Sequence, residues 1–139
     1  MNEKILEWAN EKISTFEHAS MGVIDEAGYP SVSAVSLQKP VGINEIFLTT
    51  TLDSNKAKRL MKNNKASIHC YTNMDNITLV GEVKIFAGES EKSKYWQSWV
   101  DQGCDIYPGG ATDENYCFMK FTTKRVSLFI DGESAAFEV

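Results

Sequence analysis

Two pairs of strand-like segments, each joined by a short turn, constrain the fold of this chain more than any other feature. The segments "MGVID" (21–25) and "SVSAVSL" (31–37) flank the glycine-containing turn "EAGYP". Further along, "ASIHCY" (66–71) and "ITLVGEVKIFA" (77–87) flank the polar turn "TNMDN". A short turn rich in glycine, proline or polar residues between two β-rich segments indicates a hairpin. Hairpins join antiparallel strands, so the sequence predicts an antiparallel sheet.

Three more segments have strand character, which brings the expected number of strands to six or seven. They are "EIFLTT" (45–50), "CFMKFTT" (117–123) and "RVSLFI" (125–130), and the short spacing of the last two is typical of a meander. Gly81 lies inside a long strand-like segment, where glycine indicates a bulge or a close approach of another backbone.

Three helices are expected around these strands. Apolar residues recur at three- and four-residue steps over residues 2–18, which predicts an amphipathic helix with His18 at its end. A second helix is expected to begin at Asp53 or Ser54, with Ala57, Leu60 and Met61 as its apolar stripe. A third is expected over residues 91–101, ended by Gly103.

These elements predict a mainly β protein with peripheral helices, built as a small antiparallel barrel or highly curved sheet. Regular crossover helices between strands and a GxGxxG sequence after a strand are absent, which argues against a doubly wound α/β fold. No repeat or linker interrupts the sequence, so we expect one domain over residues 1–139.

Charge is unevenly distributed in this acidic chain. The formal net charge is −5, which argues against general nucleic-acid binding, because that function needs a basic face. Residues 1–12 lack the apolar region of a signal peptide, and no segment is long and apolar enough to span a membrane. Cys70, Cys104 and Cys117 form no CxxC pair, so a cytoplasmic location is expected, with Cys70 and Cys117 as core residues.

The positive charge is concentrated in "LTTTLDSNKAKRLMKNNK" (48–65), directly after a run of hydroxyl residues. A helix N-terminus stabilises an anion, and Lys56 falls in the first helical turn, where a cation otherwise opposes the helix dipole. Thr49, Thr50, Thr51 and Ser54 would add hydroxyl donors, which together would form a phosphate site. The alternative is a solvent-exposed basic helix whose lysines bind nothing.

Other candidate features are weaker, and each has a structural alternative. Ser33, Ala34, Val35 and Ser36 would let a flat ligand approach a strand backbone, or would simply fill a tightly packed barrel. Aromatic residues would wall a ring-shaped ligand or pack a helix onto the barrel: Tyr95, Trp96, Trp99 and Tyr107. Two isolated histidines make no metal site, and no catalytic triad or carboxylate pair is evident. Any redox or transfer chemistry would therefore depend on a cofactor.

Taken in order along the chain, four segments resemble the pyridoxamine 5′-phosphate oxidase-like, FMN-binding split-barrel family, and in particular its general stress protein 26-like branch. The segments are "GYPSVSAVS" (28–36), "EIFLTTTLDSNKAKRLMKNNKASI" (45–68), "ITLVGEV" (77–83) and the region from "YWQSW" to "YPGGATDENYCFMKFT" (95–122). The second of these is the most specific.

The resemblance implies a homodimer that binds FMN at its subunit interface. It implies that the phosphate is held by Thr49, Thr50, Ser54 and Lys56, and that the flavin ring lies along Ser33, Ala34 and Val35. It further implies that Trp96 and the loop of residues 107–110, with Tyr107 and Pro108, close the site of the partner subunit.

The function expected from the resemblance is electron transfer between a reduced nicotinamide, or another donor, and an unidentified small acceptor. Two departures from the family pattern limit it. The chain ends "FIDGESAAFEV" instead of in an Arg/Trp-rich segment, so it is not expected to be a true pyridoxamine 5′-phosphate oxidase, and no arginine precedes Arg59. Alternatives are a non-catalytic flavin-binding or stress-response protein, or a split barrel that uses deazaflavin F420 or haem.

Overall fold

A computed structural model describes residues 3–38, 42–88 and 114–139 of the chain. Its elements, in chain order, are α1 (Glu3–Ile13), β1 (His18–Ile24), β2 (Pro30–Ser36), β3 (Glu45–Thr51), α2 (Asn55–Lys62), β4 (Lys65–Thr72), β5 (Asp75–Phe86), β6 (Tyr116–Ile130) and β7 (Glu133–Glu138). The predicted helix at 91–101 lies outside the described residues.

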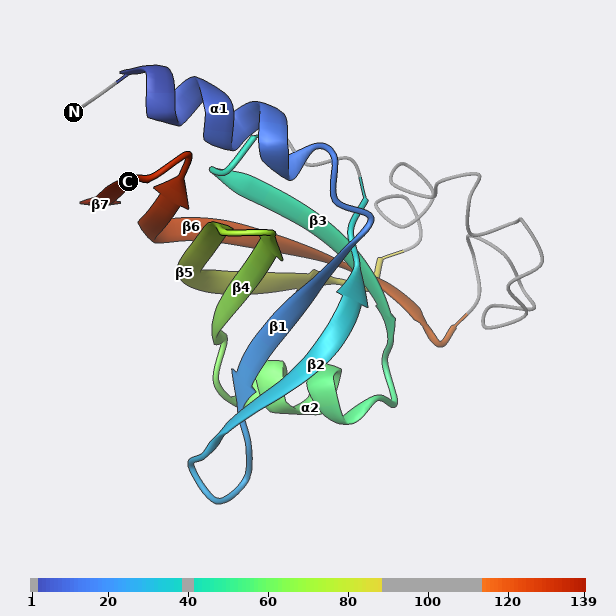
Figure 1. Ribbon diagram of the computed structural model, residues 1–139. Coiled ribbons are helices and arrows are strands. Elements are labelled where there is room, and N and C mark those ends of the chain that lie inside the picture. Colours follow the sequence, from blue (N-terminus) through green and yellow to red (C-terminus); the bar gives the residue numbers. More distant parts are fainter. Residues whose placement is uncertain (1–2, 39–41, 89–113) are drawn as a thin grey trace.

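All strand pairs are antiparallel, and they form one sheet in the order β2-β1-β4-β5-β6-β3, with β7 paired to the second half of β6. The sheet curves until its two end strands, β2 and β3, approach each other (Figure 1). In the described part of the chain they are joined where Leu37 forms an isolated bridge with Leu48 and Gln38 N donates to the Phe47 carbonyl. The fold is therefore a split barrel with seven strands, as the sequence predicted.

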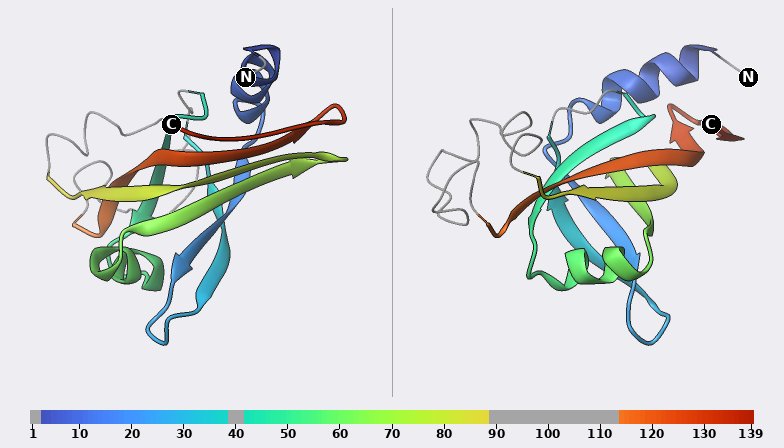
Figure 2. Two further views of the ribbon diagram at one scale, coloured as in Figure 1. Left: turned by 90° about the vertical axis from the view of Figure 1, so that its left-hand side faces the viewer. Right: turned by 180° about the vertical axis from the view of Figure 1, so that it is seen from behind.

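The hydrophobic core fills the inside of the curved sheet, and the two helices lie at opposite ends of it (Figure 2). Helix α1 buries Ile5, Ala9 and Ile13, while α2 buries Ala57 and Leu60. The apolar stripe predicted for α2 was wrong in one member, because Met61 is 59% exposed.

Helix α1 is shorter than predicted, because it ends at Ile13 and not near residue 18. The hydroxyls of Ser14 and Thr15 donate to the carbonyls of Glu11 and Lys12, each at 2.6 Å. Serine and threonine side chains that bond nearby backbone in this way compete with helix continuation. His18, predicted to end the helix, is instead the first residue of β1.

The first hairpin forms as predicted, and its turn depends on Asp25 and Gly28. The Asp25 carboxylate accepts the N–H groups of Ala27 and Tyr29 at 3.0 and 2.9 Å, while Gly28 has a φ of 88°. An aspartate that bonds its own turn, followed by a residue with positive φ, makes a stable reversal.

Residues 117–130 do not form the two strands that were predicted, because they belong to one strand, β6. The polar residues between the two apolar segments make a register shift opposite Val80 and Gly81, not a turn. Buried Thr123 satisfies its hydroxyl by donating to the Ile43 carbonyl at 2.6 Å. A threonine paired in this way is compatible with a strand interior, so the chain continues straight through.

Strand β7 was missed, although the sequence contains a strong signal for it. Asp131 and Gly132 both have positive φ, 52° and 79°, between the paired residues Ile130 and Glu133. Asp-Gly between two strand segments is a preferred two-residue hairpin turn. The C-terminal segment therefore pairs with β6.

Cys70 and Cys117 are buried, as expected for small core residues, and burial raises the pKa of the Cys70 thiol to about 11. The folded chain therefore keeps this thiol neutral at pH values at which the unfolded chain ionises it. The contribution of this thiol to the unfolding free energy is fully present below about pH 9 and is lost as the pH rises toward 11.

We expect the unfolding free energy to fall by about 1 kcal/mol more in the wild type than in a Cys70→Ala variant between about pH 8 and about pH 10. Urea titrations at the two pH values measure this difference. An equal fall in both proteins would show that the buried thiol contributes nothing to it.

Candidate functional site

The corner between β3 and α2 contains the hydroxyl and lysine residues singled out in the sequence. Ser54 is the N-cap of α2, and its Oγ accepts the N–H of Ala57 at 3.1 Å. The N–H groups of Asn55 and Lys56 have no hydrogen-bond partner in the part of the chain that the structure describes. Unpaired N–H groups at a helix start provide a partial positive charge, which favours a negatively charged ligand.

Thr50 and Ser54 form a hydroxyl pair in this corner, with their oxygens 3.1 Å apart. Either hydroxyl can donate to the other, and in both cases one hydroxyl hydrogen remains unused. Ser54 already accepts from the helix backbone, so the pair is held in place before any ligand arrives. The pair can therefore present one oriented donor to an anion.

Lys56 is half-buried, and burial lowers the pKa of its ammonium. No ion pair to a carboxylate offsets that burial within the described residues. A cation that is partly desolvated and unpaired gains more from an anion than a fully exposed cation does. By contrast, Lys58, Lys62 and Lys65 are exposed.

The three threonines of β3 have different surroundings. By strand alternation, Thr50 shares the face of the buried residues Ile46 and Leu48, and Thr49 lies on the opposite face. The Thr51 hydroxyl bonds the Asp53 carboxylate, which lowers the pKa of that carboxyl. Of the predicted phosphate residues, the structure brings Thr50, Ser54 and Lys56 to one corner, and it places Thr49 on the other face of the strand.

Asn115, just before β6, supports the corner and was missed in the sequence. Its carbonyl accepts the Leu52 N–H at 2.8 Å, and its side-chain oxygen accepts the Asp53 N–H at 3.2 Å. These bonds join the β3–α2 loop to a segment about 60 residues away. No local pattern indicates such a contact, because it depends on the pairing of β3 with β6.

The open edge of the barrel lies between β2 and β3. Beyond the Leu37–Leu48 bridge the two strands are not paired with each other. Their ribbons diverge on either side of the start of α2 (Figure 1). Continuing the antiparallel register of the bridge would place Val35 opposite Thr50. The predicted ring-binding residues of β2 and the predicted phosphate-binding corner therefore lie on the two sides of this open edge.

The main chain of β2 turns alternate residues toward this edge. Asp25 donates to Tyr29, and Leu37 donates to Glu17, at 2.8 and 2.9 Å. Together with the β1–β2 register, these bonds show that odd-numbered residues of β2 direct their main-chain groups to β1. Ala34 therefore directs its N–H and carbonyl to the open edge, where they can bond a ligand.

The side chains of the three predicted ring-binding residues differ in exposure. Ser33 and Ala34 are exposed, whereas Val35 is buried in the core. Trp96, Tyr107 and Pro108 lie outside the described residues.

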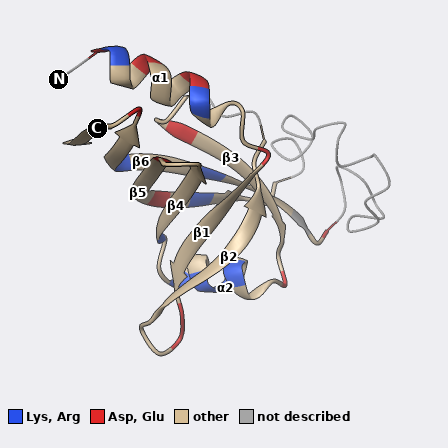
Figure 3. Ribbon diagram, viewed as in Figure 1, with Lys and Arg blue, Asp and Glu red and all other residues tan. Residues whose placement is uncertain are grey.

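Arg59 does not reach the corner at the start of α2, because its guanidinium is engaged by the β1–β2 hairpin. Nε and Nη2 donate to the two carboxylate oxygens of Glu26 at 3.1 and 3.3 Å, and Nη1 donates to the Ser31 hydroxyl at 3.2 Å. Figure 3 shows the acidic turn of the hairpin beside the basic helix α2. We call this set of three hydrogen bonds the Arg59 fork.

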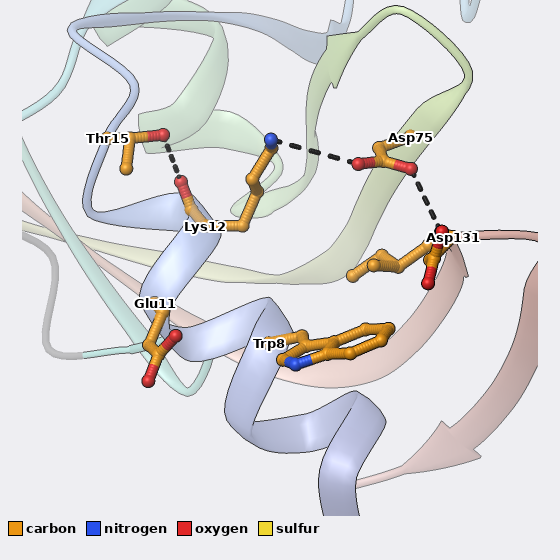
Figure 4. A pocket seen from close by; sticks show the side chains of 7 residues that line it. Trp8, Glu11, Lys12, Thr15, Asp75 and Asp131 are labelled. Carbon is orange, nitrogen blue, oxygen red and sulfur yellow. Dashed lines mark hydrogen bonds and ion pairs between the residues drawn. The ribbon is translucent and has the colours of Figure 1, made fainter.

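A second hollow lies at the other end of the barrel, between α1 and the β4–β5 and β6–β7 turns (Figure 4). It has a volume of about 420 Å³ and is walled by Trp8 and Ile130. Its polar contacts are internal, since Lys12 pairs with Asp75 at 3.7 Å and Asp75 accepts the N–H of Asp131 at 3.0 Å. The charges of Lys12 and Asp75 compensate each other, while the carboxylates of Asp131 and Glu11 leave the lining of the hollow with a net negative charge.

No three metal-ligating side chains cluster within the described ranges. His69 shares a 2.8 Å hydrogen bond between its Nε2 and the Asn76 side-chain oxygen. None of the described helices is long and apolar enough to cross a membrane.

Comparison with protein families gives a decisive match. The profile described as pyridoxamine 5′-phosphate oxidase matches residues 5–129. The chain belongs to this family. The match covers both sides of the open edge, from β2 through α2, and extends almost to the end of β6. A search of curated proteins gives no match.

Solved structures of the same fold include a Clostridium acetobutylicum protein related to general stress protein 26 of B. subtilis. It is 27% identical, with a TM-score of 0.85 over 100% of this chain and 97% of that one. An FMN-binding, pyridoxamine 5′-phosphate oxidase-related protein from Nostoc punctiforme is 11% identical, with a TM-score of 0.64 over 99% and 94%. A haem-binding protein from Mycobacterium smegmatis is 14% identical, with a TM-score of 0.71 over 99% and 59%. The last two show likeness of fold alone.

Proposed function

We propose that this member of the pyridoxamine 5′-phosphate oxidase family binds FMN across the open edge between β2 and β3 and acts as an oxidoreductase on a small molecule. The observation that carries the proposal is the corner of Thr50, Ser54 and Lys56 at a helix start. It combines an oriented hydroxyl pair with a half-buried lysine that has no carboxylate partner among the described residues. This donor set suits a phosphate dianion.

The two sides of the edge would have separate tasks. The corner would bind the phosphate, and the main-chain groups of Ala34 would bond an edge of the flavin ring, with the side chains of Ser33 and Val35 beside it. Bound FMN would supply reversible one- or two-electron redox chemistry. The chain's own residues would orient the ring and exclude water from one side of it. The resemblance further supports a homodimer with the site at the subunit interface.

Reconstitution with flavins tests the proposal. When FMN is mixed with the purified protein, we expect the flavin fluorescence to be quenched, the flavin absorption spectrum to shift and the melting temperature of the protein to rise. Riboflavin, which lacks the phosphate, is expected to bind more weakly. The absence of both effects with FMN would refute the proposal. Light scattering gives the assembly state of the same sample.

Turnover separates an enzyme from a binding protein. NADH or NADPH is expected to reduce the bound flavin, and an electron acceptor is then expected to reoxidise it. Flavin that binds but remains oxidised with every donor would favour a flavin-sequestering role over an oxidoreductase.

A further inference from the structure

The Arg59 fork joins β2, one border of the open edge, to α2, the helix that follows the other border, β3. Arg59 belongs to α2, whose first turn forms the corner, while Ser31 belongs to β2, whose edge is open. Glu26 lies in the turn between β1 and β2 and binds the same guanidinium through both carboxylate oxygens. A planar guanidinium held by three hydrogen bonds restricts distance and orientation together.

The open edge of β2 is therefore restrained at both ends. At one end the Leu37–Leu48 bridge and the bond from Gln38 N to the Phe47 carbonyl, 3.0 Å long, join β2 to β3. At the other end the Arg59 fork joins β2 to α2. Ser33, Ala34 and Val35 lie between the two restraints. Besides the fork, α2 packs against β1, the other strand of the same hairpin.

We propose that Arg59 is a positioning residue: its fork to Glu26 and Ser31 sets the separation of β2 from α2, and so matches the ring-binding and phosphate-binding sides of the site to one flavin nucleotide. The inference deepens the proposed function. Arg59 lies one turn along α2 from Lys56. Its guanidinium is engaged by the hairpin, so it acts through the hairpin and does not bind the phosphate. The Arg59 side chain is 22% exposed, and its hydrogen bonds are directed to β2 and the turn, which agrees with a structural connection between α2 and the hairpin.

Removal of the Glu26 side chain distinguishes this role from direct phosphate binding, because the two roles predict opposite changes in FMN affinity. If Arg59 positions β2, Glu26→Ala weakens FMN binding, by about fivefold for an ion pair with bidentate geometry. If Arg59 instead binds phosphate, Glu26→Ala releases the guanidinium and removes a negative charge, so FMN binds equally well or more tightly. Tighter or unchanged binding would overturn the proposal.

A double-mutant cycle and a second flavin complete the test. Arg59→Ala and the Arg59→Ala/Glu26→Ala double variant are expected to weaken FMN binding equally, because the Glu26 substitution has no further effect once the guanidinium is gone. Glu26→Ala alone is expected to weaken it no more than these, since it leaves the bond from Arg59 to Ser31. Riboflavin needs only the ring side, so its affinity is expected to change less than twofold, a selectivity that general destabilisation would not produce. Additive losses in the cycle, or equal losses for both flavins, would contradict the positioning role.

Hydrogen exchange in the flavin-free protein gives a readout that does not depend on FMN. Arg59→Ala and Glu26→Ala are expected to speed amide exchange in both β2 and the first turn of α2 relative to wild type, while Lys58→Ala, which removes an exposed cation of the same helix, leaves it unchanged. If the wild type binds no flavin, the proposed function fails, and the exchange result still decides whether the fork connects the two elements. Unchanged exchange in both fork variants would refute the connection.

Discussion

Replacing Lys56 with alanine is expected to weaken FMN binding by about 10- to 100-fold, the range for loss of a hydrogen bond to a charged group. The ammonium is half-buried, its pKa is lowered by that burial, and no carboxylate pairs with it in the described part of the chain. A phosphate would supply the missing countercharge. Titration of the quenched flavin fluorescence measures the dissociation constant.

Lys58→Ala is the matched control, because it removes the same charge two residues further along α2 from an exposed position. We expect less than a twofold change in FMN affinity, since exposed charges are screened by solvent and salt. Riboflavin affinity is expected to be the same for both variants. Equal FMN affinities for Lys56→Ala and Lys58→Ala would remove Lys56 from the site.

Gly81→Ala is expected to lower the unfolding free energy by about 3 kcal/mol or more, the upper end for an overpacked core position. A Cβ at Gly81 would overlap the Thr122 carbonyl oxygen and lie 2.9 Å from the carbonyl carbon. Both atoms are backbone in the neighbouring strand β6, so no side chain can move aside. The β5–β6 ladder would have to separate at the register shift. Urea titration measures the change.

Gly88→Ala provides the comparison for this substitution. No atom of the described residues lies within 4 Å of a Cβ built at Gly88, and its φ is outside the left-handed region. The same chemical change is therefore expected to alter stability by less than about 0.5 kcal/mol. A loss at Gly81 no larger than that at Gly88 would show that β6 accommodates the methyl group.

The predicted role of Gly81 illustrates how far local sequence patterns extend in this fold. A glycine inside a strand pattern predicted a bulge or a close backbone approach, and the structure has both. The same kind of pattern predicted both early hairpins, the Ser54 cap and the antiparallel sheet. Each depends on residues that are neighbours in the chain, so each leaves a local signal.

The errors arose where a local signal was overlooked or was outweighed by distant contacts. The Asp131–Gly132 turn was readable and was overlooked, so β7 was missed. The break predicted between Thr123 and Arg125 was wrong, because both residues belong to β6 and the hydrogen-bond partner of buried Thr123, Ile43, is 80 residues away. The register shift there belongs to a pair of strands and not to one segment.

The sequence by itself determined the fold class, from the periodicity of its segments, and the family resemblance, from the order of four motifs along the chain. It also predicted a phosphate site of Thr49, Thr50, Ser54 and Lys56 from residues that are close together in the chain. Only the tertiary structure decided the rest. It separated Thr49 from Thr50 on opposite faces of β3, paired Thr51 with Asp53, and directed Arg59 to Glu26 and Ser31. The physical reason is that the five cations of residues 56–65 are equivalent as charges in the sequence. The folding of the curved sheet brings the carboxylate of Glu26 to Arg59 and not to Lys56.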